Sequence, residues 1–393
     1  MSNRPEDQDP GASGAEDASI AGGTFVDLPQ ASLDETGEHG GRARFEPPEL
    51  RRVLDCYPLG EVTRIRELEA GSRKAPKVRV SSTEGEYLLK RRVARPELVE
   101  RVVFNHGLQL HLENEGVPVA RLVGTRRENR SMLIEDDRVY ELFEWIEGRR
   151  LVRAAPEVRN AGRILGRLHR ASVGFEPDRP SGVSGFHAAA SLKVGFKRLE
   201  PAILSVESAA DPAFLSSLVG DLRDLVAVAG DAVEEAGWSG LSRQPIHGDW
   251  HPGNLLFTPD QPTARKPGVV RAIIDFDSSR SEPRIVDVAN GLLHFAMRSD
   301  RERSPSEWPT SLSPDRMQAM LEGWSEVVGG PVEREADLLP ALMIEGLIAE
   351  SVIPIAKSGT FAGVPGGSFL SMVREKARWI HKHAAQISGL LVG

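Results

Sequence analysis

Cysteine and long apolar runs are nearly absent from this sequence. Cys56 is the single cysteine in 393 residues, which excludes an internal disulfide and a cysteine-rich metal framework. No apolar stretch approaches the roughly 20 residues that a helix needs to cross a bilayer. The first residues, MSNRPEDQDPGASGAEDAS, lack the apolar segment of a secretory signal. We therefore expect a cytoplasmic protein without a membrane partner, large enough for two or three packed units.

Excess positive charge is also absent. The formal net charge is −8, and residues 1–45 hold nine acidic and three basic residues, which leaves −2 on the remaining 348 residues. A nearly neutral body gives no support for binding nucleic acid or an anionic membrane. The arginine-rich segment GTRRENRS (124–131) falls between two predicted strands, and we interpret it as a solvated turn.

Three regions differ in composition. Residues 1–45 are rich in Gly, Ala, Ser and acidic residues, which predicts a disordered tail. Residues 46–142 predict a β-rich unit with strands near 62–68, 78–80, 87–90, 119–124 and 131–135 and a helix over 95–116. A further strand over 138–148 leads into residues 143–390, where helical periodicity dominates around a small hairpin. This order of elements indicates the α+β class.

The segment PIHGDWHPGNLLF (245–257) holds the densest set of reactive side chains. Phosphoryl transfer to a hydroxyl needs a carboxylate that orients the acceptor and takes its proton, and it needs oxygen ligands for Mg²⁺. Asp249 and Asn254 have the D-x-x-x-x-N spacing of the kinase catalytic loop and supply both. Pro252 and Gly253 stiffen and turn the loop between them.

Two further segments complete such a site. In AIIDFDSS, an apolar strand delivers Asp275 at its end, where a carboxylate can hold Mg²⁺. In EYLLKR, Lys90 ends another apolar strand, like the lysine that holds the α- and β-phosphates in kinases. The segment EAGSRKAP (69–76) stands where a phosphate-covering loop belongs. It lacks the G-x-G-x-x-G pattern, and Ser72 is its candidate phosphate contact.

A zinc hydrolase is the first alternative. It would use His247, Asp249 and His251, which stand at H-x-D-x-H spacing, as ligands. No H-E-x-x-H segment exists to complete a metal centre, and Asn254 and Asp275 would have no role. We therefore favour phosphoryl transfer and interpret His251 as a solvated or loop-packing residue.

The segment IHGDWHPGNLLF followed by AIIDFDSSRSEPRIVDVANGL resembles the aminoglycoside/choline/homoserine phosphotransferase family. The resemblance covers roughly residues 55–385, and YELFEWIEG is similar to the strand that links the two lobes of that family. It implies a bilobal, protein-kinase-like fold with a small antiparallel β-rich N-lobe and a larger, mainly helical C-lobe. It also implies ATP and Mg²⁺ as cofactors and a small molecule as substrate.

The resemblance assigns a role to each matching residue. Asp249 matches the catalytic base, and Asn254 and Asp275 match the Mg²⁺ ligands. Lys90 matches the lysine that anchors the phosphates. His247 and Asp287 match residues that brace the catalytic loop. Backbone groups of Phe143 to Trp145 match the segment that binds adenine.

One residue of the family pattern is missing from the helix over 95–116. In the family, a helix glutamate pairs with the strand lysine, and its usual position falls here near Asn105 and His106. The helix offers other glutamates: Glu97, Glu100 and Glu113. Lys90 therefore lacks its usual partner or uses another one.

We hypothesise an ATP- and Mg²⁺-dependent phosphotransferase that phosphorylates a hydroxyl group of a small molecule. The acceptor stays open among homoserine-, amino-alcohol-, sugar- and aminoglycoside-like compounds, and Glu345 and Glu350 are candidates to face a cationic one. Two alternatives on the same fold are a non-catalytic nucleotide-binding module and a protein Ser/Thr kinase. The joint presence of Asp249, Asn254 and Asp275 favours the enzyme over the module.

Overall fold

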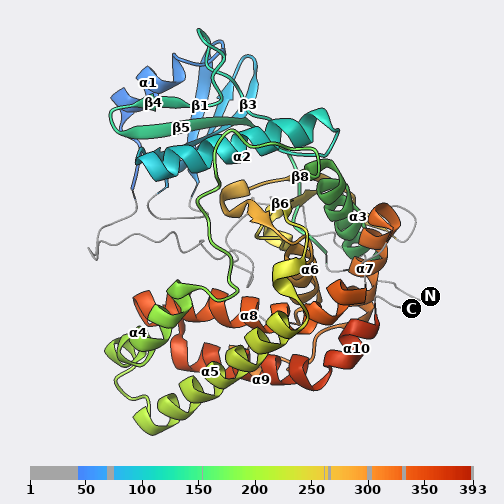
Figure 1. Cartoon of the computed structure of the whole chain (residues 1–393). Helices are drawn as coiled ribbons and strands as arrows, with labels where there is room; N and C mark the ends of the chain where they lie inside the picture. The colour runs from blue at the N-terminus through green and yellow to red at the C-terminus, as the bar shows by residue number, and fades with distance from the viewer. Residues whose placement is uncertain are drawn as a thin grey trace, which may run out of the picture.

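A β-rich lobe stacks on a larger helical lobe (Figure 1), which confirms the bilobal α+β prediction. The computed structural model describes residues 43–68, 75–152, 154–260, 262–263, 267–298, 303–329 and 333–390. The first lobe contains α1 (Pro47–Leu54), β1 (Val62–Leu68), β2 (Lys77–Ser82), β3 (Gly85–Val93), α2 (Pro96–Asn114), β4 (Leu133–Glu135) and β5 (Arg138–Glu144). The second contains α3 (Ala155–Ser172), α4 (Ala190–Val206), α5 (Pro212–Glu235), β6 (Gln244–Ile246), β7 (Leu255–Phe257), β8 (Val270–Ile273), β9 (Arg280–Glu282), α6 (Ile285–Ala296), α7 (Pro314–Val328), α8 (Glu333–Ser358), β10 (Thr360–Phe361), β11 (Val364–Pro365), α9 (Gly366–Lys382) and α10 (Ala384–Gly389).

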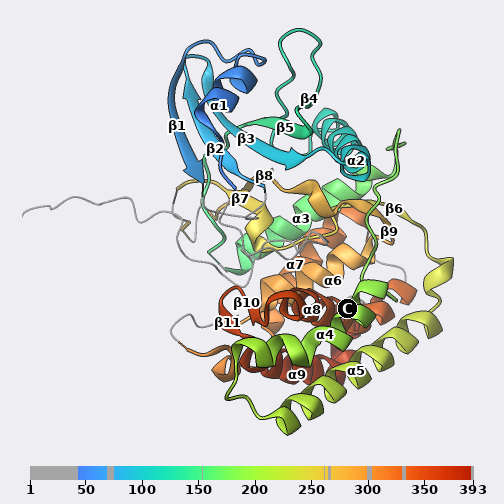
Figure 2. The same cartoon turned by 90° about the vertical axis from the view of Figure 1, so that its left-hand side faces the viewer.

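Within the described residues, five strands form one antiparallel sheet in the order β1-β2-β3-β5-β4, seen at the top of Figure 2. The predicted hairpin is confirmed, because β2 and β3 pair from Lys77 with Lys90 to Ser82 with Gly85. Gly85 has φ +146°, a conformation that residues with a side chain rarely adopt, so glycine suits the turn.

The predicted strand over 119–124 is wrong. Val119 forms an isolated parallel bridge with Ile273 of the helical lobe, while Leu122 forms an antiparallel bridge with Phe143 of β5. The alternation of apolar residues is real, but the backbone hydrogen bonds of this segment are divided between two partners, so no continuous strand forms. The fifth strand is instead β5, which was predicted as a linker and is part of the sheet.

Helix α1 was not predicted, and it packs on one face of the sheet. Pro47 stands in its first turn, where a missing N–H costs nothing because no helical acceptor exists there. The Glu49 carboxylate accepts two hydrogen bonds of 2.7 Å from Arg91 of β3, and Tyr140 donates to it at 2.8 Å. This buried pair keeps Arg91 on the side of the sheet away from the helical lobe.

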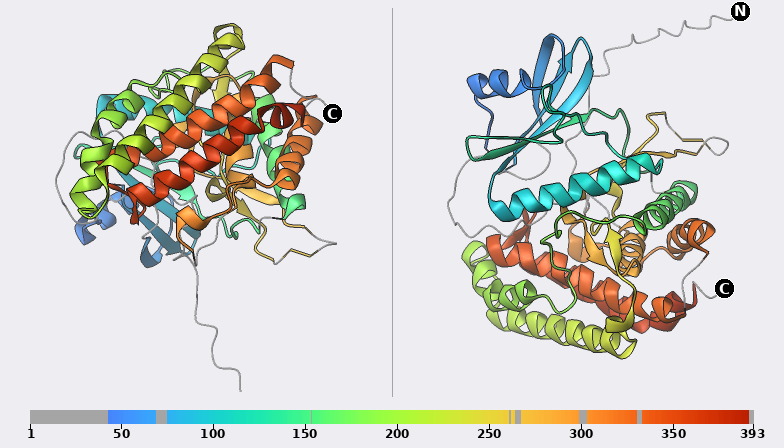
Figure 3. Two further views of the ribbon diagram at one scale, coloured as in Figure 1. Left: turned by 90° about the horizontal axis from the view of Figure 1, so that it is seen from below. Right: turned by 45° about the horizontal axis from the view of Figure 1, so that its top comes forward.

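Helix α2 lies between the sheet and the helical lobe (Figure 3, right). It confirms the helix predicted over 95–116. Its apolar residues Phe104, Leu108 and Leu112 pack into the core of the helical lobe. Asn105 and His106, at the position expected for the family glutamate, are buried as well.

The helical lobe is built around α8. Helices α3, α5 and α9 carry their buried apolar residues mainly on one face, in agreement with the helical periodicity of this region, whereas α8 lacks such a face because it is buried on nearly all sides. In the described part of the chain, Glu335–Ser358 of α8 is long and apolar enough to cross a membrane, with a mean hydropathy of 1.8. The expectation from the sequence that no apolar stretch approaches the length of a membrane span is therefore wrong. Of the apolar window, 83% is buried inside the protein, as in a core helix.

Two small sheets carry the segments singled out in the sequence. The β7–β8 hairpin confirms the predicted hairpin, and β6 pairs with β9. The chain leaves the first lobe alongside β7, where Arg149 forms an antiparallel bridge with Phe257. A Cβ on Gly148 would lie 2.9 Å from Phe257 O, so this approach requires a glycine.

Candidate active site

Asp287 of α6 fixes the loop that follows β6. Its Oδ2 accepts from the backbone N–H of His247 and its Oδ1 from that of Gly248, each at 2.8 Å. His169 Nε2 donates to Oδ2 at 3.3 Å, and Trp324 Nε1 donates to His169 Nδ1 at 3.0 Å. Burial raises the pKa of Asp287, but the bond from His169 and the backbone N–H groups hold it below its usual value. An ionised, buried carboxylate therefore holds the start of the loop in place.

The Asp249 carboxylate contacts Asn254 and His251. Asn254 Nδ2 donates to Oδ2 and to the backbone O of Asp249, each at 3.0 Å. His251 Nε2 lies 3.3 Å from the same Oδ2. His251 Nδ1 accepts from the Gly253 N–H at 3.0 Å, so the ring proton is on Nε2 and faces the carboxylate. Of the two interpretations of His251, the solvated residue is wrong, because His251 is buried, and the loop-packing residue agrees with its contacts to Gly253 and Asp249.

The surroundings keep Asp249 ionised. Burial would raise its pKa, but His251 foremost, with His247 and His294, holds the pKa well below its usual range. Burial lowers the pKa of His251 and Asp249 raises it, with a net rise. A second proton on His251 would have to displace the Gly253 N–H from Nδ1, so we assign the neutral ring that donates from Nε2.

The second half of the site is the turn after β8. Asp275 has φ +62°, a left-handed conformation that Asp tolerates better than most residues. Ile274 is bound to the catalytic loop twice: its N–H donates to Asn254 O at 2.9 Å, and its O accepts from His247 Nε2 at 3.2 Å. Asn254 and Asp275 thus come from two loops that are bonded to each other.

These two side chains suit Mg²⁺, which prefers carboxylate and amide oxygens. Asn254 Nδ2 is engaged with Asp249, so its Oδ1 is the side-chain atom left to ligate a cation. Mg²⁺ needs only one or two protein side chains when substrate phosphates and water complete its shell. The donor set therefore fits a Mg·nucleotide.

Lys90 reaches the same turn from β3. Its Nζ lies 2.8 Å from Asp277 Oδ2 and 3.5 Å from Asp275 Oδ1. Lys77, its cross-strand neighbour on β2, has Nζ 3.9 Å from Asp275 Oδ2. Burial and Arg92 lower the pKa of Lys90, but the two aspartates outweigh them and raise it, whereas burial lowers the pKa of Lys77. The buried amine of Lys90 and the partly buried amine of Lys77 lie beside a carboxylate that can bind a metal ion, so together they form a site that fits a polyphosphate.

Helix α2 supplies no glutamate to Lys90. Glu97 and Glu100 are exposed, and Glu113 pairs with Arg121 at 2.6 Å. His106, at the expected position, instead contacts Glu141 of β5 at 3.0 Å. The family pair between helix and strand is therefore absent from this fully described helix, and Asp277 is the residue that contacts the Lys90 amine.

The segment expected to bind adenine differs in part from the prediction. The Trp145 N–H donates to Glu86 O at 2.8 Å, so an adenine ring cannot use this amide without breaking that bond. The Trp145 N–H is therefore engaged with the Glu86 carbonyl, and the match of Phe143 to Trp145 with the adenine-binding segment stays a prediction for their other backbone groups. Phe143 pairs with Leu88 inside the sheet, directly before this segment. Ser72 lies outside the described residues.

The H-x-D-x-H segment does not form a zinc site. His247 Nε2 donates to Ile274 O, and His251 presents its protonated nitrogen to Asp249. In the part of the chain that the structure describes, no three His, Cys, Asp or Glu side chains are arranged to hold a metal ion. The zinc hydrolase alternative is therefore wrong for these residues.

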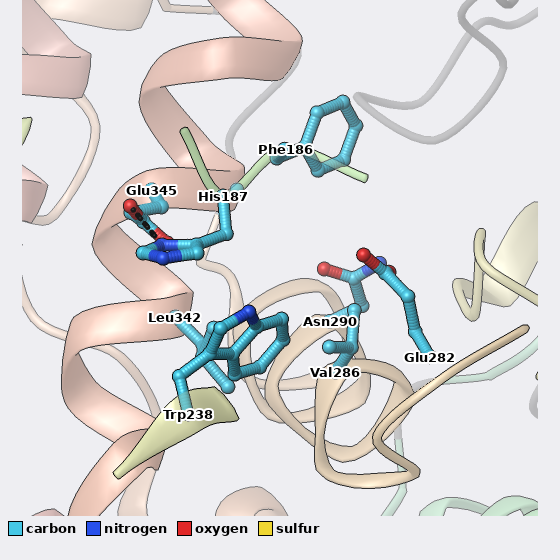
Figure 4. Close-up of a pocket in the computed structure, with 9 residues that line it drawn as sticks. Phe186, His187, Trp238, Glu282, Val286, Asn290, Leu342 and Glu345 are labelled. Atoms are coloured by element: carbon cyan, nitrogen blue, oxygen red, sulfur yellow. Dashed lines mark hydrogen bonds and ion pairs between the residues drawn. The ribbon is translucent and has the colours of Figure 1, made fainter. Parts of the chain in front are cut away.

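A pocket lies between α6, α8 and the segment before α4 (Figure 4). Its lining includes apolar and aromatic side chains and four polar ones: Phe186, His187, Trp238, Glu282, Val286, Asn290, Leu342 and Glu345. His187 donates from Nδ1 to Glu345 at 3.0 Å and from Nε2 to Glu234 at 2.9 Å. Asn290 is buried, and its Nδ2 has no hydrogen-bond partner among the residues described.

Arg280 joins this pocket to the catalytic loop. Its Nε donates to Glu282 Oε2 at 2.6 Å, and its NH1 donates to the backbone O of Gly248 at 3.1 Å. Gly248 directly precedes Asp249. Asn290 stands on α6 one turn after Asp287, the residue that holds this loop. The pocket and the Asp249 loop therefore share their supports.

Known proteins are similar to this chain along most of its length. The profile of the phosphotransferase enzyme family matches residues 64–326. A homoserine kinase from Sinorhizobium medicae (strain WSM419) is 25% identical over 298 residues, which are 75% of this chain and 79% of that protein. A microcompartment-associated aminopropanol kinase superposes with a TM-score of 0.60 at 16% identity, covering 87% of this chain and 99% of the other. An amicoumacin kinase solved with AMP-PNP and Ca²⁺ gives a TM-score of 0.58 at 12% identity, covering 88% and 94%.

Proposed function

Because this chain belongs to the phosphotransferase enzyme family, which makes it a small-molecule kinase, we propose that it transfers the terminal phosphoryl group of Mg·ATP to a hydroxyl group. The family profile covers about two-thirds of the sequence, and it includes every residue assigned to catalysis, to Mg²⁺ and to the nucleotide. Action in the cytoplasm is part of this proposal, supported by the single cysteine.

The observation that supports the proposal best is the bonding between the two loops. Asn254 binds the Asp249 carboxylate through its side chain and the Ile274 N–H through its backbone O. The proposed base and both proposed metal ligands therefore form one bonded unit, and Lys90 approaches Asp275 from the other lobe. A module that only binds nucleotide has no use for an ionised carboxylate held in one orientation.

Each residue then has a role in phosphoryl transfer. Lys90 holds the α- and β-phosphates, and Asn254 and Asp275 hold Mg²⁺. Bound ATP with Mg²⁺ supplies an activated phosphoryl group whose charge is partly neutralised. Asp249 accepts a hydrogen bond from the acceptor hydroxyl, orients it, and receives its proton as the phosphate ester forms. His247 and Asp287 support the loop without touching the substrate.

The pocket of Figure 4 is the proposed acceptor site. Its carboxylates Glu282 and Glu345, its aromatic rings and the Asn290 donor suit a compact molecule with polar groups on an apolar frame. Homoserine-, amino-alcohol-, sugar- and aminoglycoside-like compounds all stay candidates. Both Glu345 and Glu350 contact a histidine, His187 and His294 respectively, but Glu345 lines the pocket and is therefore the better candidate to face a cationic acceptor.

A screen of ADP release over a library of hydroxyl-bearing metabolites, with Mg·ATP and the full chain, tests the proposal. We expect turnover with at least one small alcohol, and phosphate transfer to its hydroxyl verified by mass spectrometry. Binding of ATP without turnover on any compound would favour the non-catalytic module. Transfer to protein serine or threonine, with no small acceptor, would favour the protein kinase.

A further inference from the structure

Lys90 is a buried cation whose counter-ion comes from the opposite lobe. Its side chain is 7% exposed, and Nζ lies 2.8 Å from Asp277 Oδ2. A buried ammonium group needs a carboxylate partner, because burial without one costs several kcal/mol. Asp277 is the last residue of the Asp-Phe-Asp turn after β8, 187 positions further along the chain. The pair therefore joins the sheet directly to the proposed metal turn.

Asp277 is held by two arginines as well. Arg92, two residues from Lys90 and so on the same face of β3, donates from NH1 to Oδ2 at 2.7 Å and from NH2 to Oδ1 at 2.5 Å. Arg101 of α2 donates from Nε to the backbone O of Asp277 at 2.8 Å. Burial raises the pKa of Asp277, but Arg92 and Lys90 hold it well below its usual value. The carboxylate is thus ionised and restricted to one position.

A second carboxylate supports Arg92 from behind. Glu141, the cross-strand partner of Lys90 on β5, accepts from Arg92 NH2 at 3.3 Å and from His106 Nε2 at 3.0 Å. His106 occupies the helix position where a glutamate was expected. Helix α2 therefore acts on Lys90 indirectly, by two routes: through His106, Glu141 and Arg92, and through the bond from Arg101 to the backbone O of Asp277.

We infer that Asp277 is the positioning residue of Lys90, and that it takes the role expected of a helix glutamate. Its carboxylate sets where the ammonium group lies and couples the phosphate anchor to the turn that carries Asp275. This inference rests on the proposed function, because it assumes that nucleotide phosphates bind at Lys90. Since Asp275 and Asp277 share one turn, a movement of that turn moves Lys90 with it.

The affinity for Mg·ADP, measured by calorimetry on the full chain, tests this inference without an acceptor. Asp277→Asn should weaken binding about tenfold or more, because Lys90 loses its charged partner. Asp277→Glu, which keeps the charge, should restore most of the affinity. In a Lys90→Met background, Asp277→Asn should change the affinity less than about twofold, since its partner is already gone.

Arg101→Met is the matched control, because it removes a bond to the same turn without touching the Lys90 pair. The inference is overturned if Arg101→Met weakens binding as much as Asp277→Asn does. It is also overturned if Asp277→Asn weakens the affinity for Mg·ADP by the same factor in the Lys90→Met background.

Thermal unfolding establishes beforehand that each variant is folded. If the Asp277→Asn chain does not fold, the test compares the affinity of Lys90→Met for Mg·ADP with that of Lys90→Met/Asp277→Asn. Equal affinities support the inference, and a weaker affinity of the double variant overturns it. A wild-type chain that does not bind Mg·ADP would instead contradict the proposed function.

Discussion

His251 Nε2 lies 3.3 Å from Asp249 Oδ2, and the Gly253 N–H on the opposite ring nitrogen fixes the proton between them. The imidazole therefore donates to the carboxylate that we propose as the base. The H-x-D-x-H spacing is typical of metal ligands, but in this loop it places His251 as a hydrogen-bond donor beside Asp249.

Replacing His251 should impair catalysis more than nucleotide binding. His251→Ala removes a donor to a buried carboxylate, so we expect kcat to fall roughly 10- to 100-fold while the KM for ATP stays near its wild-type value. His251→Gln keeps an N–H donor and should recover much of the rate. Steady-state kinetics on the acceptor found in the screen measure both values. Equal rates for His251→Ala and the wild type would remove His251 from the mechanism.

Asp249→Asn should abolish most turnover without loss of nucleotide affinity. The amide keeps the shape of the carboxylate but cannot receive the hydroxyl proton, so kcat should fall about 10²- to 10⁴-fold. Calorimetry with Mg·ADP should give a dissociation constant near the wild-type value. Full activity of this variant would contradict the assignment of Asp249 as the base.

Glu141 should make stability depend on pH in the acid range. Burial raises its pKa, but Arg92 and His106 outweigh burial and lower it from 4.5 to about 2. A folded-state pKa below the unfolded one stabilises the protein fully above about pH 4.5, and this contribution is lost as the pH falls toward 2.

The variant Glu141→Gln isolates this contribution. Its free energy of unfolding should be lower than that of the wild type at about pH 7, and the difference should shrink below about pH 4.5. Urea unfolding of both chains at several pH values measures the difference. If the difference stays constant down to about pH 3, the ionised form of Glu141 contributes nothing to stability.

Gly248→Ala should disturb the catalytic loop through a collision rather than through backbone strain alone. Gly248 has φ +78°, and a Cβ there would lie 2.2 Å from Ser278 O. Gly237 has a similar φ of +85°, but a Cβ would meet nothing within 4 Å, so Gly237→Ala is the matched control. We expect a loss of roughly 1 kcal/mol of stability for the control and a clearly larger loss, with reduced kcat, for Gly248→Ala. Thermal unfolding compares the two, and equal shifts would show that strain alone is responsible.

Local sequence predicted the half of the site that lies in two short loops. Asp249 and Asn254 are five residues apart in one loop, so their spacing almost fixes their geometry. Asp275 ends a buried strand, and the strand pattern alone shows where it emerges. The same reasoning predicted the β2–β3 hairpin, whose turn and alternation are local properties.

Contacts between distant segments could not be predicted in this way. The pairing of Lys90 with Asp277 depends on how the lobes approach each other, and no pattern within either segment encodes that distance. The bond from the Trp145 N–H to Glu86 O is another case, because it depends on where the chain leaves the sheet. His251 was missed although it lies in the motif, since the choice between donor and ligand depends on the Gly253 N–H.

Among the described residues, backbone bridges tie the helical lobe to the segments on either side of β5 at two places. Val119 pairs with Ile273 while its neighbour Leu122 pairs with Phe143, and Arg149 pairs with Phe257 after the chain has left the sheet. The side chains of Lys90, Arg92 and Arg101 add a connection of a different kind, at Asp277. Opening over the Asp275 turn should therefore break these side-chain contacts while the backbone bridges stay intact and set the line about which the lobes turn.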